Sequence, residues 1–257
     1  MNLIVDLQYF PSIILYEGLN NFSNIVFEQY EHYQKMSFRN RCQIAGAEGV
    51  INLSVPLVKG RDQKTLLKDV RISDRDRWQD QHWKTILSCY SRSPWFEFYR
   101  DGLGELYRKP FVFLMDWNLA CFEWSLVTLQ IPLPFALTEG WQKSYDREEW
   151  VDWRGRILPK NIGKPGDRVA GLASGDKASR ESRSLGGNKT SGEVRSSGVV
   201  PGAVSKKLLS GEGIPGVDRR IKYRQVFEER TGFLPGLSIL DLLFCEGKRA
   251  GSLLKGA

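Results

Sequence analysis

The fold class is decided by residues 2–12, NLIVDLQYFPS. Alternate positions from Leu3 to Tyr9 are apolar and Ile4 adds to the opposite face, which is typical of a largely buried strand. Pro11 ends this strand, and residues 12–19 have the composition of a short helix. A strand that turns directly into a helix predicts an α/β protein.

The same two periodicities predict most of the remaining elements. A period of two predicts a second strand over residues 24–30, a β-hairpin from 41–44 and 50–55, and a strand over 67–72. A period of 3.6 then predicts helices over 73–91, 93–106 and 111–129, the first begun by a capping box at Ser73 and Asp76. Helices over 223–230 and 239–245 follow, the latter capped by Ser238. We therefore expect a sheet region, a layer of helices and a C-terminal helix that returns to the same domain.

Aromatic residues are absent from the tract between Arg154 and Lys222, although the chain holds 30 of them. We expect residues 1–160 to form an α/β catalytic-type domain, residues 161–221 a disordered Gly/Ser/basic insertion, and residues 222–257 a helical segment that completes the domain. The tract carries 15 basic and 6 acidic residues, so the rest of the chain has a small acidic surplus despite the net charge of +7. This distribution argues against nucleic-acid binding. A solvated insertion is the simpler interpretation, and a basic tether is its alternative.

The four cysteines are far apart and have no neighbouring histidine, so we expect no metal site. The N-terminus lacks a basic region ahead of its apolar run, and the longest apolar window, residues 111–137, contains charged residues and two prolines. We expect a cytoplasmic protein without a transmembrane segment. The sequence identifies no cofactor and no oligomeric state.

Four stretches, taken in order, resemble the WbqC-like protein family: residues 6–12, residues 33–41, residues 78–83 with Tyr90 and 93–99, and residues 223–227 with 232–244. The resemblance covers about residues 1–160 and 222–257. Members of that family occur in O-antigen gene clusters, and transfer of glycine or another acyl group to a sugar has been proposed for them. The resemblance therefore implies a transferase of surface-polysaccharide biosynthesis.

The turn after the first strand is the first candidate site. Backbone N–H groups at a helix N-terminus bind phosphate or carboxylate, and Gln8, Tyr9 and Ser12 are placed to face such a ligand. No glycine-rich phosphate-binding motif accompanies this turn. The alternative is that Pro11 simply ends the strand and Gln8 hydrogen-bonds a neighbouring loop.

The segment from Lys35 to Arg41 contains three cationic side chains, Lys35, Arg39 and Arg41, together with Asn40. Two guanidinium groups suit phosphate or carboxylate, so we expect Arg39 and Arg41 to hold an anion while Gln8 and Asn40 orient polar groups. In the alternative interpretation the arginines pair with nearby acids. The acids considered are Glu28, Glu31 and Glu48.

His32 and His82 are the only imidazoles in the chain, so either is a candidate to accept the proton of a sugar amine. Trp78 and Trp83 flank His82 and are candidates to stack on a sugar ring, and Tyr90 on the same helix completes this group. A hydrogen-bonded structural role is the alternative for each histidine. The aromatic run after Pro94 is interpreted mainly as core.

The resemblance implies transfer of an acyl or aminoacyl group, glycyl for example, to an activated amino sugar, and the candidate residues above are assigned to that reaction. The expected ligand is a nucleotide-sugar or another anionic small molecule. The rival hypothesis is a non-catalytic binding or assembly module that holds an anionic partner at the same basic site. Adenylation of an acid is a third possibility, which lacks a phosphate-loop signature.

Overall fold

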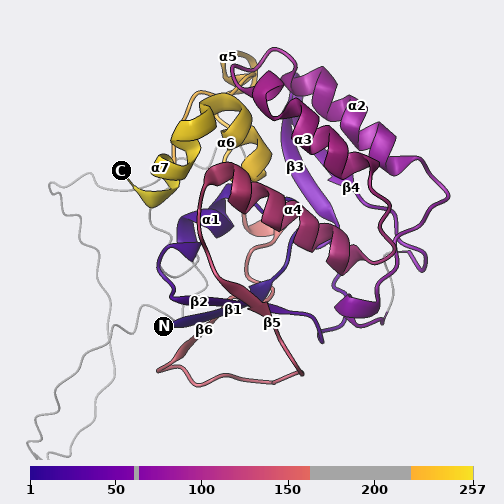
Figure 1. Ribbon diagram of the computed structural model, residues 1–257, viewed down its shortest axis with the longest axis vertical. Coiled ribbons are helices and arrows are strands. Elements are labelled where there is room, and N and C mark those ends of the chain that lie inside the picture. The colour runs from indigo at the N-terminus through magenta and orange to yellow at the C-terminus, as the bar shows by residue number, and fades with distance from the viewer. Residues whose placement is uncertain (61–63, 163–220, 257) are drawn as a thin grey trace, which may run out of the picture. The chain divides into compact units, whose positions relative to one another are not determined.

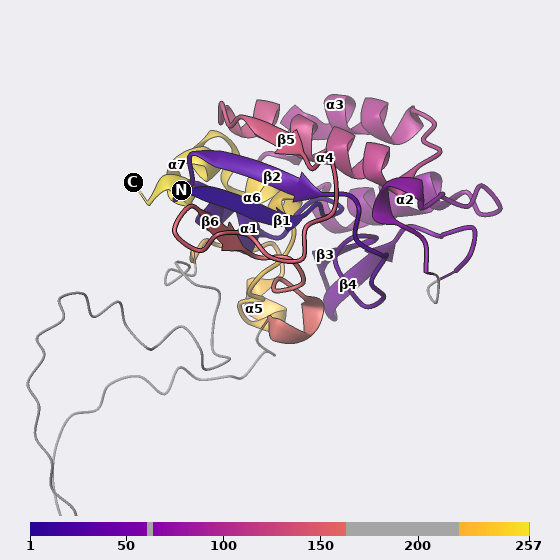
Figure 2. The same ribbon diagram turned by 90° about the horizontal axis from the view of Figure 1, so that it is seen from below.

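The computed structural model describes residues 1–60, 64–162 and 221–256, and it confirms the mixed α/β class. Four strands form one parallel sheet in the order β5-β2-β1-β6. They are β1 (Asn2–Asp6), β2 (Asn24–Glu28), β5 (Phe135–Leu137) and β6 (Trp150–Asp152). Because all four run the same way, their carboxyl ends meet at one edge of the sheet (Figures 1 and 2).

The connection between the two central strands follows from the opening sequence. Phe10, at φ +40°, and Pro11 turn the chain after β1, and helix α1 (Ile13–Leu19) leads back to β2. The Ser12 hydroxyl caps α1 by accepting a hydrogen bond from the backbone N–H of Ile14 at 3.3 Å. The predicted strand–turn–helix unit is confirmed.

A separate antiparallel hairpin pairs β3 (Arg41–Gly46) with β4 (Gly49–Ser54). The two strands are joined by Ala47 and Glu48, and Gly49 follows at φ +121°, a conformation that a side chain disfavours. The sequence predicted this hairpin, with a longer connection than the structure has.

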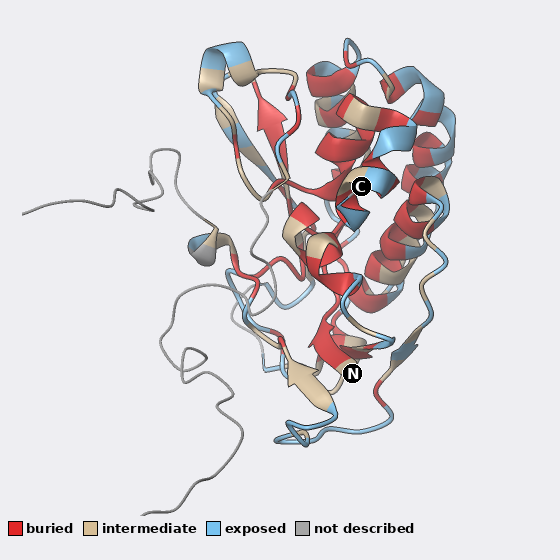
Figure 3. Cartoon of the chain, turned by 90° about the vertical axis from the view of Figure 1, so that its left-hand side faces the viewer, coloured by how far each residue is buried: buried red, intermediate tan, exposed pale blue. Residues whose placement is uncertain are grey.

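Three long helices, α2 (Trp78–Tyr90), α3 (Phe96–Arg108) and α4 (Leu114–Leu129), form a layer beside the parallel sheet (Figure 2). The Phe122 ring of α4 packs edge-on against Phe27 of β2 with centroids 4.9 Å apart. Figure 3 shows that the buried residues of these helices face inward and that their outer faces are exposed. The predicted helical layer is confirmed.

The C-terminal segment returns to the fold after the residues that are not described. It contains α5 (Glu228–Thr231), α6 (Ile239–Glu246) and α7 (Ala250–Lys255). Backbone hydrogen bonds join it to the start of α1, with Ile13 N–H donating to the Leu237 carbonyl at 2.9 Å. The Ser238 hydroxyl caps α6 as predicted, but Asp241 does not complete a capping box because its carboxylate accepts hydrogen bonds from Tyr90 and Tyr223.

Several predicted elements differ in the structure. Residues 67–72 are not a strand: a 3-10 turn (Leu67–Asp69) is followed by isolated bridges that pair Arg71 with Phe113 and Ile72 with Leu57. Ser73 does not begin α2, since its hydroxyl accepts from Arg75 N–H and the helix starts at Trp78. In place of the helix predicted over 223–230, the structure has only the short α5 (Glu228–Thr231). Tyr223 and Gln225 lie outside it and are held by buried side-chain hydrogen bonds to Asp241 and Leu234.

The disordered insertion predicted for residues 161–221 lies almost wholly outside the described residues. The start of the aromatic-free tract is described and packs into the fold: Ile157 and Leu158 are buried. None of the helices among residues 1–60, 64–162 and 221–256 combines the length and the apolar character needed to cross a bilayer.

Candidate functional site

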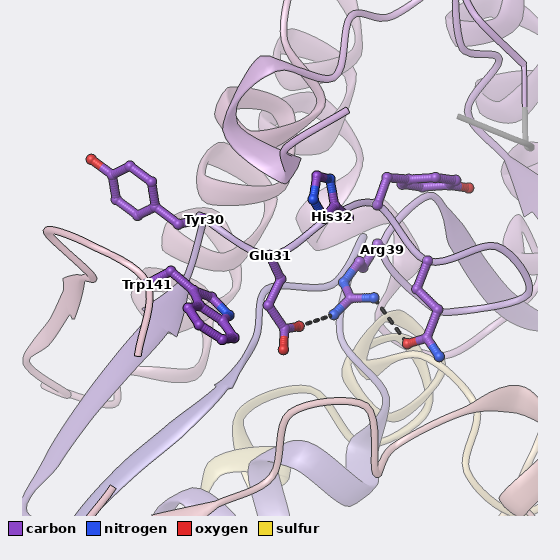
Figure 4. A pocket seen from close by; sticks show the side chains of 7 residues that line it. Tyr30, Glu31, His32, Arg39 and Trp141 are labelled. Atoms are coloured by element: carbon purple, nitrogen blue, oxygen red, sulfur yellow. Dashed lines mark hydrogen bonds and ion pairs between the residues drawn. The ribbon is translucent and has the colours of Figure 1, made fainter. Parts of the chain in front are cut away.

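An open pocket of about 680 Å³ lies at the carboxyl edge of the parallel sheet. It is built mainly from the connection between β2 and β3, which carries all the lining residues from Tyr30 to Arg39, and Trp141 comes from the connection after β5 (Figure 4). The lining residues are Tyr30, Glu31, His32, Tyr33, Gln34, Arg39 and Trp141. Ligands of open parallel α/β sheets bind outside the carboxyl ends of the strands, so the position itself favours a binding site.

Three neighbouring strands end in acidic residues beneath this pocket. Asp6 closes β1, Glu28 closes β2 directly opposite it in the register, and Asp152 closes β6. Asp6 and Glu28 are buried. Buried carboxylates need hydrogen-bond donors or cationic partners, and two arginines supply them here.

Arg39 is the first of these arginines, and its side chain is 1 % exposed. Its Nη2 donates to Asp6 and, at 2.8 Å, to Glu31 Oε2, while its Nη1 donates to Gln34 Oε1 at 3.0 Å (Figure 4). Asp6 also accepts the backbone N–H of Gly155 at 2.8 Å. Arg39 therefore joins the end of β1 to earlier residues of its own connection. Its guanidinium group already donates hydrogen bonds to two carboxylates and one side-chain amide.

Arg154 is the second, and it follows β6 directly. It donates to Asp152 Oδ2 at 2.7 Å and to Glu28 Oε2 at 3.2 Å, and it lies 3.8 Å from Glu31 Oε1. The hydrogen bond to Asp152 raises the pKa of Arg154 above its ordinary value. The guanidinium group therefore stays charged and bridges the ends of β2 and β6.

Glu31 is the one carboxylate among the pocket-lining residues, and its side chain is 28 % exposed. Burial raises its pKa, and the nearby Asp6 carboxylate adds to the rise, while Arg39 and Arg154 oppose it. Carboxyl groups whose pKa is shifted by burial and by neighbouring charges occur often at binding and catalytic sites.

Aromatic side chains flank the acidic centre. Trp141 is 56 % exposed although it is large and apolar, and Tyr30 lies on the same side of Glu31 (Figure 4). His32 is exposed and lines the pocket as well. A carboxylate, an imidazole and an accessible indole thus share one cavity.

The predicted anion site at the start of α1 is filled by the chain's own groups. Ser12 N–H donates to Gln8 Oε1 at 3.4 Å, and the N–H groups of the next two residues donate to Leu237 and to Ser12 Oγ. Gln8 and Tyr9 are both buried. The alternative interpretation, in which Gln8 holds the turn, describes this arrangement.

The second predicted histidine lies in the core rather than in the pocket. His82 Nδ1 and Tyr9 Oη are 3.0 Å apart, and Tyr9 also hydrogen-bonds Tyr107 at 2.6 Å. Burial lowers the pKa of His82 to about 4, which keeps it neutral at neutral pH. Trp78 packs edge-on against His82, and Trp83 packs against Tyr107, so both tryptophans belong to this aromatic cluster.

The remaining predicted site residues lie in separate parts of the structure. Asn40 is buried between the Tyr33 hydroxyl and the Val55 carbonyl, and the Tyr90 hydroxyl accepts from Ala45 N–H while donating to Asp241. Arg41 opens β3 and Lys35 lies in the exposed part of its loop, and neither lines the pocket. The structure therefore brings together two predicted residues, Arg39 and His32.

Sequence reasoning missed most of the acidic centre. Glu28 and Glu31 appeared there only as possible partners of the arginines, which is the role Glu31 has beside Arg39. Arg154 was counted with the aromatic-free tract. The available signal was an acidic residue inside each of two predicted apolar strands, Asp6 and Glu28, because a carboxylate in a buried strand needs a partner.

No set of three or more His, Cys, Asp or Glu side chains within the described ranges is arranged to hold a metal ion. The fold and the site define an α/β protein with a parallel sheet whose carboxyl edge carries a polar, aromatic-flanked pocket. A family model for the WbqC-like protein family matches residues 8–157, and the chain belongs to that family. No curated protein and no solved structure matches the chain.

Proposed function

We propose that the chain transfers an acyl or aminoacyl group, such as glycyl, to the amine of an activated amino sugar in O-antigen or other surface-polysaccharide biosynthesis. The supporting observation is the pocket in which Glu31 and His32 lie beside the accessible indole of Trp141. Membership of the WbqC-like protein family also supports this proposal.

The chemistry requires an amine whose lone pair is free. His32 accepts a proton from the ammonium form of the sugar, and the freed lone pair of the nitrogen then bonds the acyl carbon of an activated donor. The bond between that carbon and the donor's leaving group breaks. The leaving group departs with the electron pair and takes up the second proton, which the nitrogen loses as the amide forms. The Trp141 ring offers a flat apolar surface for one face of the sugar.

The rival proposal is a non-catalytic module that holds an anionic partner on the Lys35 to Arg41 segment. It has less support from the geometry. Arg39 already donates to Asp6, Glu31 and Gln34, and an anion would have to replace two carboxylates.

The test is a transfer assay. Nucleotide-linked sugars with a free amine are incubated with acetyl and glycyl thioesters of coenzyme A, and mass spectrometry detects N-acylated sugar. The proposal predicts a product that falls sharply in His32→Gln and persists in Arg100→Gln, a matched change on the exposed face of α3. Absence of product from every pair, with no shift of the melting temperature by any of the sugars, would refute it.

A further inference from the structure

The surroundings of the pocket carry more negative than positive charge. Four carboxylates share two guanidinium groups at the carboxyl edge, which leaves two negative charges uncompensated. The members are Asp6, Glu28, Glu31 and Asp152 with Arg39 and Arg154. The neighbouring cation Lys68 is offset by its ion pair with Asp69. Arg41 lies near enough to Tyr33 of the pocket wall to oppose the rise in the pKa of that phenol, and counting it leaves an excess of one negative charge.

The loop that carries Trp141 also has an excess of negative charge. Residues 139–149 contain four acidic and two basic side chains. A pocket whose walls and rim share an excess of one charge concentrates ligands of the opposite charge. Beside Glu31, the pocket therefore favours a positively charged group of a ligand over a negatively charged one.

Glu31 is the acid that has room for a ligand. The Asp6 carboxylate already accepts hydrogen bonds from Arg39 and the Gly155 N–H. The Glu28 carboxylate accepts them from the Tyr30 N–H, the Thr138 hydroxyl and Arg154. Glu31 Oε2 accepts from Arg39, but Oε1 accepts no hydrogen bond from a residue of the described ranges, and its 3.8 Å separation from Arg154 is too long for one. This oxygen can take an N–H from a bound molecule.

The aromatic walls suit the same kind of ligand. Trp141 and Tyr30 lie on one side of Glu31 (Figure 4), and aromatic faces attract organic cations. Lys68 Nζ already lies 5.5 Å from the centroid of the Tyr30 ring, so the exposed Trp141 indole is the face offered to a ligand. An ammonium group on a sugar can contact the carboxylate while the sugar ring lies against the indole.

We propose that the pocket binds its sugar as a protonated primary amine and that Glu31 is the counter-ion that selects this amine against the N-acetylated sugar. The choice of a sugar rests on the proposed function, whereas the choice of a cation rests on the charges of the pocket. An acetamide is uncharged and bulkier than an ammonium, so it forfeits the ion pair with Glu31.

The experiment measures binding without turnover. D-glucosamine, D-galactosamine and their N-acetyl derivatives are titrated into the full chain by calorimetry. The amines are expected to bind at least about tenfold more tightly than the acetamides, a ratio in the range of a single charge-assisted contact. In Glu31→Gln the ratio falls to about twofold or less, and in the control Glu97→Gln, an exposed acid of α3, it stays at the wild-type value.

A second measurement covers the case in which Glu31→Gln fails to fold. In the wild-type chain, raising the salt concentration from about 0.05 to 0.5 M should reduce the amine preference severalfold because the ion pair is partly exposed. Equal binding of amines and acetamides, no binding of either, an unchanged ratio in a folded Glu31→Gln, or a ratio insensitive to salt would each overturn the proposal. A clear amine preference without any acyl product would instead contradict the transferase and leave the ammonium site standing.

Discussion

Replacing Arg154 by Met should destabilise the chain more than any change at an exposed arginine. The side chain is 7 % exposed and holds Glu28, whose side chain is fully buried, together with Asp152. Breaking a buried ion pair by removing one partner costs about 3–5 kcal/mol. Glu28 keeps two hydrogen-bond donors, Tyr30 N–H and the Thr138 hydroxyl, and Asp152 is 37 % exposed, so we place the loss near the lower end, at about 3 kcal/mol.

The assay is urea unfolding of Arg154→Met and of Arg100→Met, whose exposed ion pair with Glu97 should contribute less than about 1 kcal/mol. The deficit should also depend on pH. Arg154 lowers the pKa of Glu31, so its loss raises that pKa further, and protonation at low pH relieves the unpaired charge. We therefore expect a smaller deficit at pH 5 than at pH 8. Equal unfolding free energies for the two variants would refute the bridging role of Arg154.

Three further changes test other parts of the structure. Tyr9→Phe removes the hydroxyl that lies between His82 and Tyr107. It should lower the free energy of unfolding, measured by chemical denaturation, by about 1–3 kcal/mol. An unchanged free energy of unfolding would show that these two buried hydrogen bonds do not stabilise the fold. Asp241 has a pKa raised by burial from 3.8 to about 6, so its contribution to stability is present below the lower value and is lost as pH rises through the higher one. Asp241→Asn should remove this component, seen as a smaller difference between urea midpoints at pH 4 and pH 7, and an unchanged difference would contradict it. Trp141→Ala should leave the free energy of unfolding within about 0.5 kcal/mol of the wild-type value, because the indole is exposed. The same change should weaken amino-sugar binding in the calorimetric titration. Binding as tight as that of the wild type would exclude the indole from the site.

The elements that could be predicted from the sequence are those whose pattern is local. The apolar run of β1, the cap at Ser238, and the helical spacing of α2 to α4 each lie within one stretch of chain. The strands β5 and β6 have three residues each, too few to show a period, and they form because β2 and β1 offer partners.

The site was harder to predict than the fold because its contacts are distant in sequence. Arg39 was singled out, but its partner Asp6 lies 33 residues away, and Glu28 and Arg154 are 126 residues apart. His82 and the tryptophans of α2 have residue types that suit a sugar site, and burial against Tyr9 and Tyr107 became visible only in three dimensions.

The most direct test of the central claim, that the carboxyl edge of the parallel sheet is the ligand site, is a nuclear magnetic resonance titration of the ¹⁵N-labelled chain with D-glucosamine. The account predicts saturable shifts at the Trp141 indole N–H and at the backbone amides of His32 and Gln34, which line the pocket, with the indole signals of Trp78 and Trp117 in the core unmoved. Shifts that gather elsewhere, or no saturable shift at the pocket, would contradict it.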